Sequence, residues 1–301
     1  MQYISNSPKR NATFDAIKKE TSPSTPNLRP LCPTRWTVRT AAFESVLLNY
    51  AVLIDTFEEI STSTRDEHGA KAAGLASRLQ EFKTFFGFQL CLKVFSVTEQ
   101  LSCLLQSKQT SIDTAINQAN VLKSHLTRLR SDSEFDLFYK DVEQCATDVT
   151  DKPELPRQRR ASKRVDPDNS QHQFSTPKDI HRKTYFELLD VMIQEIDRRL
   201  SKKALEIPHL IESVLLKSFA EEALPCDAID KLSQFYLNDL TQDKLAREVT
   251  FIPDILQCVR KSEKYKGLKQ ISSISTICDI MIDFPSYAEL CPETVTFIRI
   301  F

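Results

Sequence analysis

Apolar side chains recur at intervals of three and four residues along most of this chain, which is the spacing of one face of a helix. Only 4 of its 301 residues are glycine. Because strand-rich and α/β folds use glycine in turns and phosphate-binding loops, this scarcity favours helices joined by polar loops. The sequence therefore predicts a mostly α fold, a helical bundle. The clearest stretch follows Trp36, at Phe43, Val46, Leu47, Tyr50, Leu53, Ile54 and Phe57.

The same spacing predicts about ten helices. We expect one long helix after Trp36, broken at 61–68, and a very apolar helix over 85–101 at the buried centre of the bundle. Ser111 is a plausible N-cap for the helix that follows it. The β-branched and aromatic end at 295–301 predicts a strand or a fraying end. Further helices are predicted at 70–82, 112–129, 135–145, 186–200, 210–215, 229–240, 245–259 and 271–282.

The chain's single tryptophan stands in the segment Leu31–Arg39, directly after Arg35. A guanidinium can bind a phosphate through two hydrogen bonds, and an indole offers a flat face to an unstacked base. A lone tryptophan at a helix start is also a common core anchor. Composition alone favours the anchor, and the pair by itself leaves both roles open.

The amino-acid sequence of residues 32–40, Cys-Pro-Thr-Arg-Trp-Thr-Val-Arg-Thr, resembles a segment of the hAT superfamily of transposases. Within that superfamily it is most similar to the domesticated zinc-finger MYM-type group. Weaker similarity extends over 6–10, 155–160, 185–200 and 284–285, so it spans nearly the whole chain. In the family, the tryptophan lies beside the active site and stabilises a flipped nucleotide. The resemblance therefore implies DNA contact through Arg35, Trp36 and Arg39.

The resemblance also implies an architecture: a helical hAT insertion domain with remnants of an RNase H-like core and a long disordered loop. Residues 151–178 are rich in proline and charge, which is typical of a disordered linker. We expect five segments. They are an N-terminal segment with a short helix and a proline-rich loop (1–34), the first half of the insertion domain (35–150), the linker (151–178), the second half (179–283) and a remnant approaching a C-terminal dimerisation block (284–301).

Family members cut DNA with two aspartates and a glutamate that converge on Mg²⁺ ions. By resemblance, the aspartates lie upstream of this chain and the glutamate lies downstream. Glu289 and Glu293 are the nearest candidates, and both lack the serine and arginine neighbours of the family's glutamate. We therefore expect no catalytic residue, no metal site, no cofactor and no enzyme activity.

Five cations gather in the predicted linker, where they form either a nuclear-import signal or a contact with a phosphate backbone. A solvated loop balanced by Asp166 and Asp168 is an equally weighted alternative. The cations are Arg157, Arg159, Arg160, Lys163 and Arg164.

Other chemistry-bearing residues form no recognisable pattern. The five histidines are scattered without paired spacing, so surface or capping roles are expected. The eight cysteines include no C-x-x-C pair, so we expect small buried hydrophobes in a reducing compartment. Glu187 and Glu195 fall opposite an apolar stripe and should be solvated.

Two functions remain in view. One is a catalytically incomplete hAT-like protein with residual DNA binding, and the other is a helical protein-interaction scaffold in which Trp36 is packed. A net charge of −1 means that any DNA site is local. The chain begins without a secretory leader and has no apolar run of membrane-spanning length. We expect a nuclear or otherwise cytoplasmic protein that is not secreted. Its expected partner is DNA, or else a protein or a second copy, and neither a membrane nor a small-molecule substrate.

Overall fold

The computed structural model describes residues 2–30, 39–64, 66–107, 110–155, 174–220, 222, 224, 227–236, 238–268 and 271–300. Their elements are helices, and no strand occurs within these ranges. The predicted mostly α fold is confirmed. The chain divides into two compact units, one of Met1–Ser102 with Leu122–Ile193 and the other of Cys103–Val121 with Gln194–Phe301.

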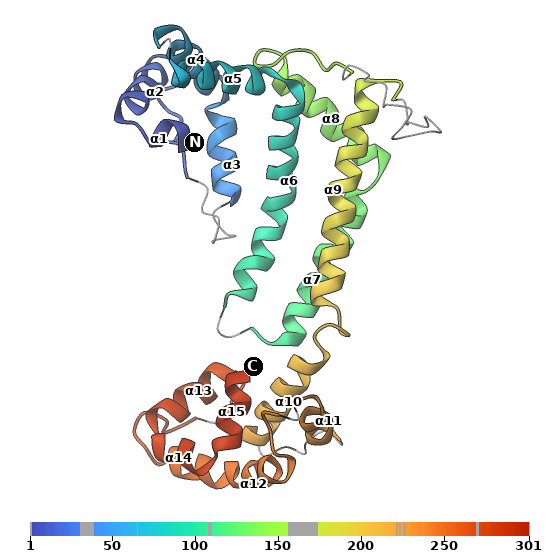
Figure 1. Cartoon of the computed structure of the whole chain (residues 1–301). Coiled ribbons are helices and arrows are strands. Elements are labelled where there is room, and N and C mark those ends of the chain that lie inside the picture. Colours follow the sequence, from blue (N-terminus) through green and yellow to red (C-terminus); the bar gives the residue numbers. More distant parts are fainter. Residues whose placement is uncertain are drawn as a thin grey trace. The chain divides into compact units, whose positions relative to one another are not determined.

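Helices α1 to α9 supply the first unit, and α6, α7 and α9 also contribute residues to the second (Figure 1). Helix α4 packs against both α2 and α5. The bounds are α1 (Gln2–Ser5), α2 (Pro8–Thr21), α3 (Arg39–Leu48), α4 (Tyr50–Ser63), α5 (Glu67–Gln80), α6 (Phe82–Leu105), α7 (Ile112–Leu129), α8 (Asp132–Ala146) and α9 (Pro177–Leu200).

The single long helix expected after Trp36 is wrong, because Asn49 divides it into α3 and α4. Asn49 is fully buried, and its side-chain amide donates to the carbonyl oxygens of Pro26 at 2.9 Å and Ser45 at 2.8 Å. Asparagine side chains compete with helical hydrogen bonds in this way. The break therefore fastens an upstream loop to the start of α4.

Aromatic rings from α6, α8 and α9 form the core of the first unit. The rings are those of Phe82, Phe86, Phe135, Phe138, Tyr139 and Tyr185, and the buried Tyr185 hydroxyl donates to the carbonyl oxygen of Leu129 at 3.0 Å. Helix α6 was expected to be buried on most sides. Much of its surface is instead only partly buried, and its buried residues are Phe82, Phe85, Phe86, Leu90, Val94 and Leu101.

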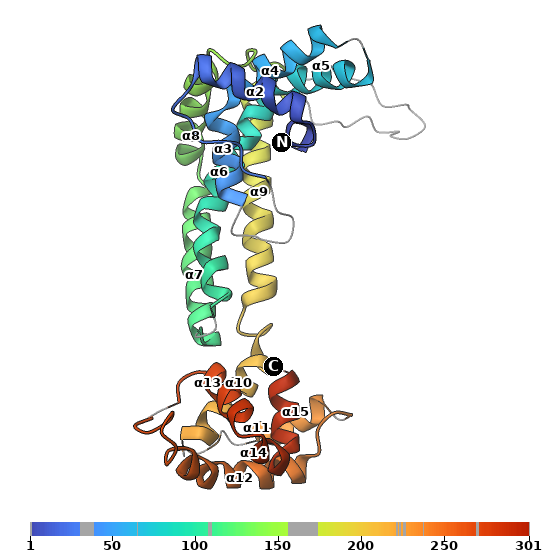
Figure 2. The ribbon, with the colours of Figure 1, turned by 90° about the vertical axis from the view of Figure 1, so that its left-hand side faces the viewer.

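Helices α10 to α15 build most of the second unit (Figure 2). Their bounds are α10 (Glu206–Ala220), α11 (Ala228–Phe235), α12 (Gln242–Val259), α13 (Ile274–Asp283), α14 (Pro285–Leu290) and α15 (Pro292–Ile300). They share one hydrophobic core, whose fully buried members include Phe219, Leu232, Ile252, Ile277 and Phe297.

The strand or fraying end expected at 295–301 is wrong, because α15 covers this stretch up to Ile300. Strand propensity is a weak preference, and tertiary contacts override it. Here Phe297 is fully buried in the core of the second unit, and Thr294 is fully buried too.

The N-cap expected at Ser111 is confirmed, since its hydroxyl accepts the backbone N–H of Thr114 at 3.2 Å. A second acceptor serves the same helix end, because the Glu212 carboxylate accepts the N–H of Ile112 at 2.9 Å. Across the described parts of the chain, no helix is both long and apolar enough to cross a membrane.

Candidate nucleic-acid interface

The segment Leu31–Arg39 is anchored at its upstream flank. The backbone N–H of Arg29 donates to the buried Ser45 hydroxyl of α3 at 3.0 Å. Closer to α2, the Thr25 hydroxyl donates to the Asn49 side-chain oxygen at 3.0 Å, and the Lys18 ammonium donates to Asn27 at 2.5 Å. The loop that leads into the candidate interface is therefore fixed to α2, α3 and the start of α4.

The downstream flank is anchored on aromatic rings. Arg39 begins α3, and its guanidinium lies over the Phe95 ring of α6, 5.9 Å from the centroid. One turn later, Phe43 stacks on the same ring with centroids 5.6 Å apart and planes at 9°. Phe43 also meets Phe88 edge to face at 5.9 Å. Of the three predicted DNA-contact residues, Arg39 is thus packed along the α3–α6 contact.

Arg35 and Trp36 lie outside the described residues, as do all five cations of the predicted linker, Arg157, Arg159, Arg160, Lys163 and Arg164. The described ends of the linker are held. The N–H of Asp151 donates to the Gln80 carbonyl oxygen at 2.8 Å. At the other end, at the start of α9, the Thr176 hydroxyl donates to the Asp179 carboxylate at 2.8 Å and accepts the backbone N–H of Asp179 at 3.2 Å.

The helices on either side of the linker pack together. Arg130 forms an ion pair with Asp190, and Arg182 forms one with Asp132 at 2.5 Å. Both guanidiniums lie over the Phe186 ring, that of Arg130 at 5.1 Å and that of Arg182 at 5.5 Å from its centroid. The chain on either side of the linker is therefore joined by charge and by ring contacts within the first unit.

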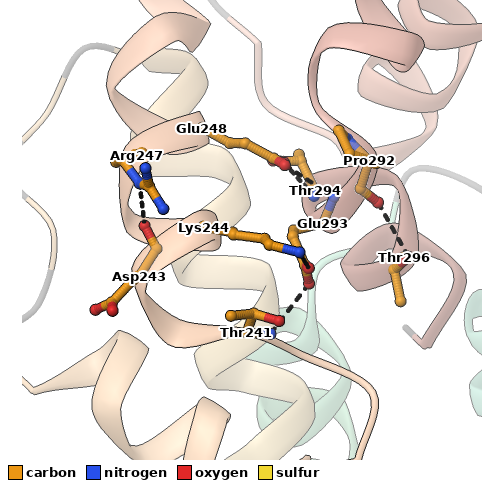
Figure 3. Close-up of polar contacts among 9 residues, drawn as sticks. All are labelled: Thr241, Asp243, Lys244, Arg247, Glu248, Pro292, Glu293, Thr294 and Thr296. Carbon is orange, nitrogen blue, oxygen red and sulfur yellow. Dashed lines mark hydrogen bonds and ion pairs between the residues drawn. The ribbon is translucent and has the colours of Figure 1, made fainter.

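Glu293, one of the two glutamates considered for the acid that the resemblance implies, is engaged in a structural network (Figure 3). Its carboxylate accepts the N–H of Thr241 at 3.1 Å and lies 3.9 Å from the Lys244 ammonium. In return, the buried Glu248 of α12 accepts the N–H of Glu293 at 3.0 Å and that of Thr294 at 2.7 Å.

Each of these carboxylates thus caps the start of the other's helix, Glu248 for α15 and Glu293 for α12 (Figure 3). Unpaired N–H groups at a helix start attract negative charge, which accounts for the pairing. Sequence reasoning missed it, because the two acceptors lie 45 residues or more from their donors. Glu289 is exposed at the end of α14.

The histidines were expected on the surface or at caps, and for His181 this is wrong. His181 is 7% exposed, with ring centroids 4.6 Å from Phe86 and 5.0 Å from Phe82. Burial lowers its pKa to about 4. His209 forms a contact of 3.2 Å with Asp113. Among the residues described, no group of three or more histidine, cysteine or acidic side chains is placed to hold a metal ion.

The cysteines were expected to be buried, which holds for Cys291 and is wrong for Cys103, Cys145 and Cys258, all of which are exposed. These three occupy outward positions of α6, α8 and α12, so helix geometry determines their environment. Glu187 is exposed as expected, whereas Glu195 is only partly exposed and pairs with Arg198 and Arg199.

The chain was compared with known families and folds. No protein-family model matches it, and no solved structure matches it.

Proposed function

We propose that this protein is a catalytically incomplete, hAT-transposase-like protein that contacts DNA through the segment Leu31–Arg39. The observation that carries the proposal is the anchoring of the segment at both flanks, through Arg29 on Ser45 and through Arg39 on Phe95. Fixed flanks reduce the conformational entropy that a recognition segment loses when it binds, so a short segment can contribute more affinity. DNA is proposed as the partner because residues 32–40 resemble the hAT superfamily. The helical insertion domain and the remnants of an RNase H-like core are proposed on the same ground.

Non-catalytic action is part of the same proposal. The environment of Glu293 supports it, because that carboxylate is already committed to the start of α12 and to Lys244. A carboxylate that coordinates a metal ion in phosphoryl transfer must instead converge with other carboxylates on that ion.

The single tryptophan makes the proposal directly testable, because intrinsic indole fluorescence reports on Trp36 alone. Titration of the full chain with single-stranded or hairpin DNA should quench this fluorescence, since a stacked base lies on the indole face. Base stacking on an aromatic side chain contributes roughly 1–3 kcal/mol. Trp36→Ala should therefore weaken single-stranded or hairpin binding by about fivefold to 150-fold, and duplex binding by less.

Arg29→Ala is the matched control, because Arg29 is an exposed cation beside the segment. Its hydrogen bond to Ser45 comes from its backbone N–H, so the variant keeps that bond. It should cause a small loss on every substrate through charge alone. Unchanged indole fluorescence on titration, or equal small losses for Trp36→Ala on duplex and single strand, contradicts the DNA proposal.

A second candidate is a helical protein-interaction scaffold, in which Trp36 is a packed anchor. The packing of Arg39 and Phe43 on Phe95 favours it, because the start of α3 is already used to hold α6. The scaffold predicts a blue-shifted indole emission in the free protein that is insensitive to DNA. It also predicts that Trp36→Ala lowers the free energy of unfolding by about 3–5 kcal/mol, the usual cost of removing a large core aromatic.

A further inference from the structure

The turn between α12 and α13 concentrates positive charge. Residues 260–268 carry Arg260, Lys261, Lys264 and Lys266 against one acid, Glu263. The chain as a whole has a net charge of −1, so this turn departs locally from the average. Sequence reasoning passed over it, because these residues belong to none of the segments that carry the resemblance.

The turn has a defined conformation that an aromatic side chain anchors. Tyr265 is buried, packs on Phe284 with centroids 6.0 Å apart, and donates its hydroxyl hydrogen to Asp283 at 2.5 Å. Gly267 has φ +96°, a conformation that other residues rarely adopt. The Arg260 guanidinium Nε donates to the Leu268 carbonyl oxygen at 3.2 Å and closes the turn.

Two of the lysines present their charge to solvent. Lys261 and Lys266 are exposed, and neither forms an ion pair with any described residue. Lys264, by contrast, pairs with Asp283. Cations at the end of a helix stabilise its dipole, which accounts for Arg260 and Lys261 at the end of α12. It does not account for Lys266, because the effect falls off within the last turn of the helix.

We infer that the turn 260–268 binds the phosphate backbone of nucleic acid. Lysine is a compact point charge that contacts phosphate oxygens without sequence preference, which suits a nucleic-acid backbone. A membrane-surface site would combine its cations with exposed apolar side chains. Here the aromatic ring of Tyr265 is buried and Leu268 is partly buried, so the turn offers charge without an apolar group to insert.

This inference shares only the partner class with the proposed function, because it concerns residues outside the segment 31–39. The test uses the full chain with a fluorescent duplex, and binding is followed by anisotropy from 0.05 to 0.3 M salt. The variant is Lys261→Gln with Lys266→Gln. The control is Lys202→Gln with Lys203→Gln, a second exposed lysine pair in the same unit.

Each phosphate contact contributes about 0.7–0.9 to the slope of log affinity against log salt concentration. If both lysines contact phosphate, the double variant should reduce the magnitude of that slope by roughly 1.5–2 and weaken binding about tenfold or more at 0.1 M salt. The control pair should leave both quantities near those of the unchanged chain. Equal effects of the two lysine pairs overturn the inference, because they reveal only general charge.

Trp36→Ala in the same assay separates the two proposals. A loss in the Lys261/Lys266 variant without a loss in Trp36→Ala supports the turn and contradicts the proposed interface. A loss in Trp36→Ala without a loss in the Lys261/Lys266 variant overturns the inference about the turn and supports the proposed interface. Failure of the full chain to bind any nucleic acid overturns the inference about the turn. The inference about the turn is also overturned if the chain binds vesicles of phosphatidylserine and phosphatidylcholine more tightly than nucleic acid and if that binding depends on Lys261 and Lys266.

Discussion

The buried histidine in the aromatic core of the first unit makes stability depend on pH. His181 packs against Phe86, Phe82 and Tyr139, and burial lowers its pKa to about 4. In the unfolded chain the same side chain titrates near its ordinary value of about 6.5. Below that value the unfolded state binds a proton that the folded state does not take up, so stability falls as the pH falls from about 6.5 to about 4.

The magnitude follows from the two pKa values. With about 6.5 for the unfolded and about 4 for the folded state, lowering the pH from 7 to 5 removes about 2 kcal/mol of unfolding free energy. This is an upper bound, because water reaching the opened core lessens the penalty. Few carboxylates titrate in this window, so the histidine contributes a large part of any change measured there.

The perturbation is His181→Phe, which keeps an aromatic ring of similar size and removes the titrating group. Urea unfolding followed by circular dichroism at pH 7 and pH 5 gives the pH-dependent loss for each protein. The loss should be about 2 kcal/mol smaller in the variant than in the unchanged chain. His68→Gln is the control for removing an imidazole from an exposed position. If His181→Phe loses as much stability as the unchanged chain over this interval, the histidine is not held neutral by its surroundings.

Three further outcomes follow from the geometry. Gly69→Ala should destabilise the first unit by about 2 kcal/mol or more, because a Cβ at this position lies 1.7 Å from the Thr64 carbonyl oxygen. Gly74→Ala is the control: nothing lies within 4 Å of its new Cβ, so it should stabilise the protein by up to about 1 kcal/mol. Urea unfolding measures both changes, and an unchanged stability in Gly69→Ala contradicts the close approach. Glu248→Gln should lower the free energy of unfolding by about 1–3 kcal/mol and raise the rate of amide hydrogen exchange over Pro292–Ile300, because two backbone N–H groups lose a charged acceptor. Glu289→Gln, the control, should change neither the free energy of unfolding nor the exchange rate. Trypsin should cleave at 157–164 and leave fragments that co-elute, because the Tyr185–Leu129 hydrogen bond and the Arg130–Asp190 pair join the flanks; separate elution refutes this.

Local periodicity was sufficient to predict the fold class and the positions of most helices. It could not predict the break at Asn49, because that break depends on the Pro26 carbonyl oxygen 23 residues away. It also misjudged the end of the chain, where burial of Phe297 overrides strand propensity. In both places, contacts from distant segments decide between local alternatives that the sequence pattern leaves nearly equal.

The candidate sites divide in the same way. The segment containing Trp36 could be found because its residues are adjacent in the sequence. The environment of His181 could not, because α6 and α8 supply the neighbouring rings. The basic turn at 260–268 needed the structure too, since its exposure depends on the burial of Tyr265 and on the bond to Asp283.

The paired caps of α12 and α15 also set an order in time. During synthesis from the amino end, Thr241 emerges 52 residues before the carboxylate that accepts its N–H. At about 5–20 residues per second, that interval lasts roughly 3–10 s, far longer than a helix needs to form. Until it ends, α12 lacks this acceptor and Glu248 has no helix to cap. Residues 241–300 should therefore reach their stable packing as one cooperative event that begins only when α15 has left the ribosome.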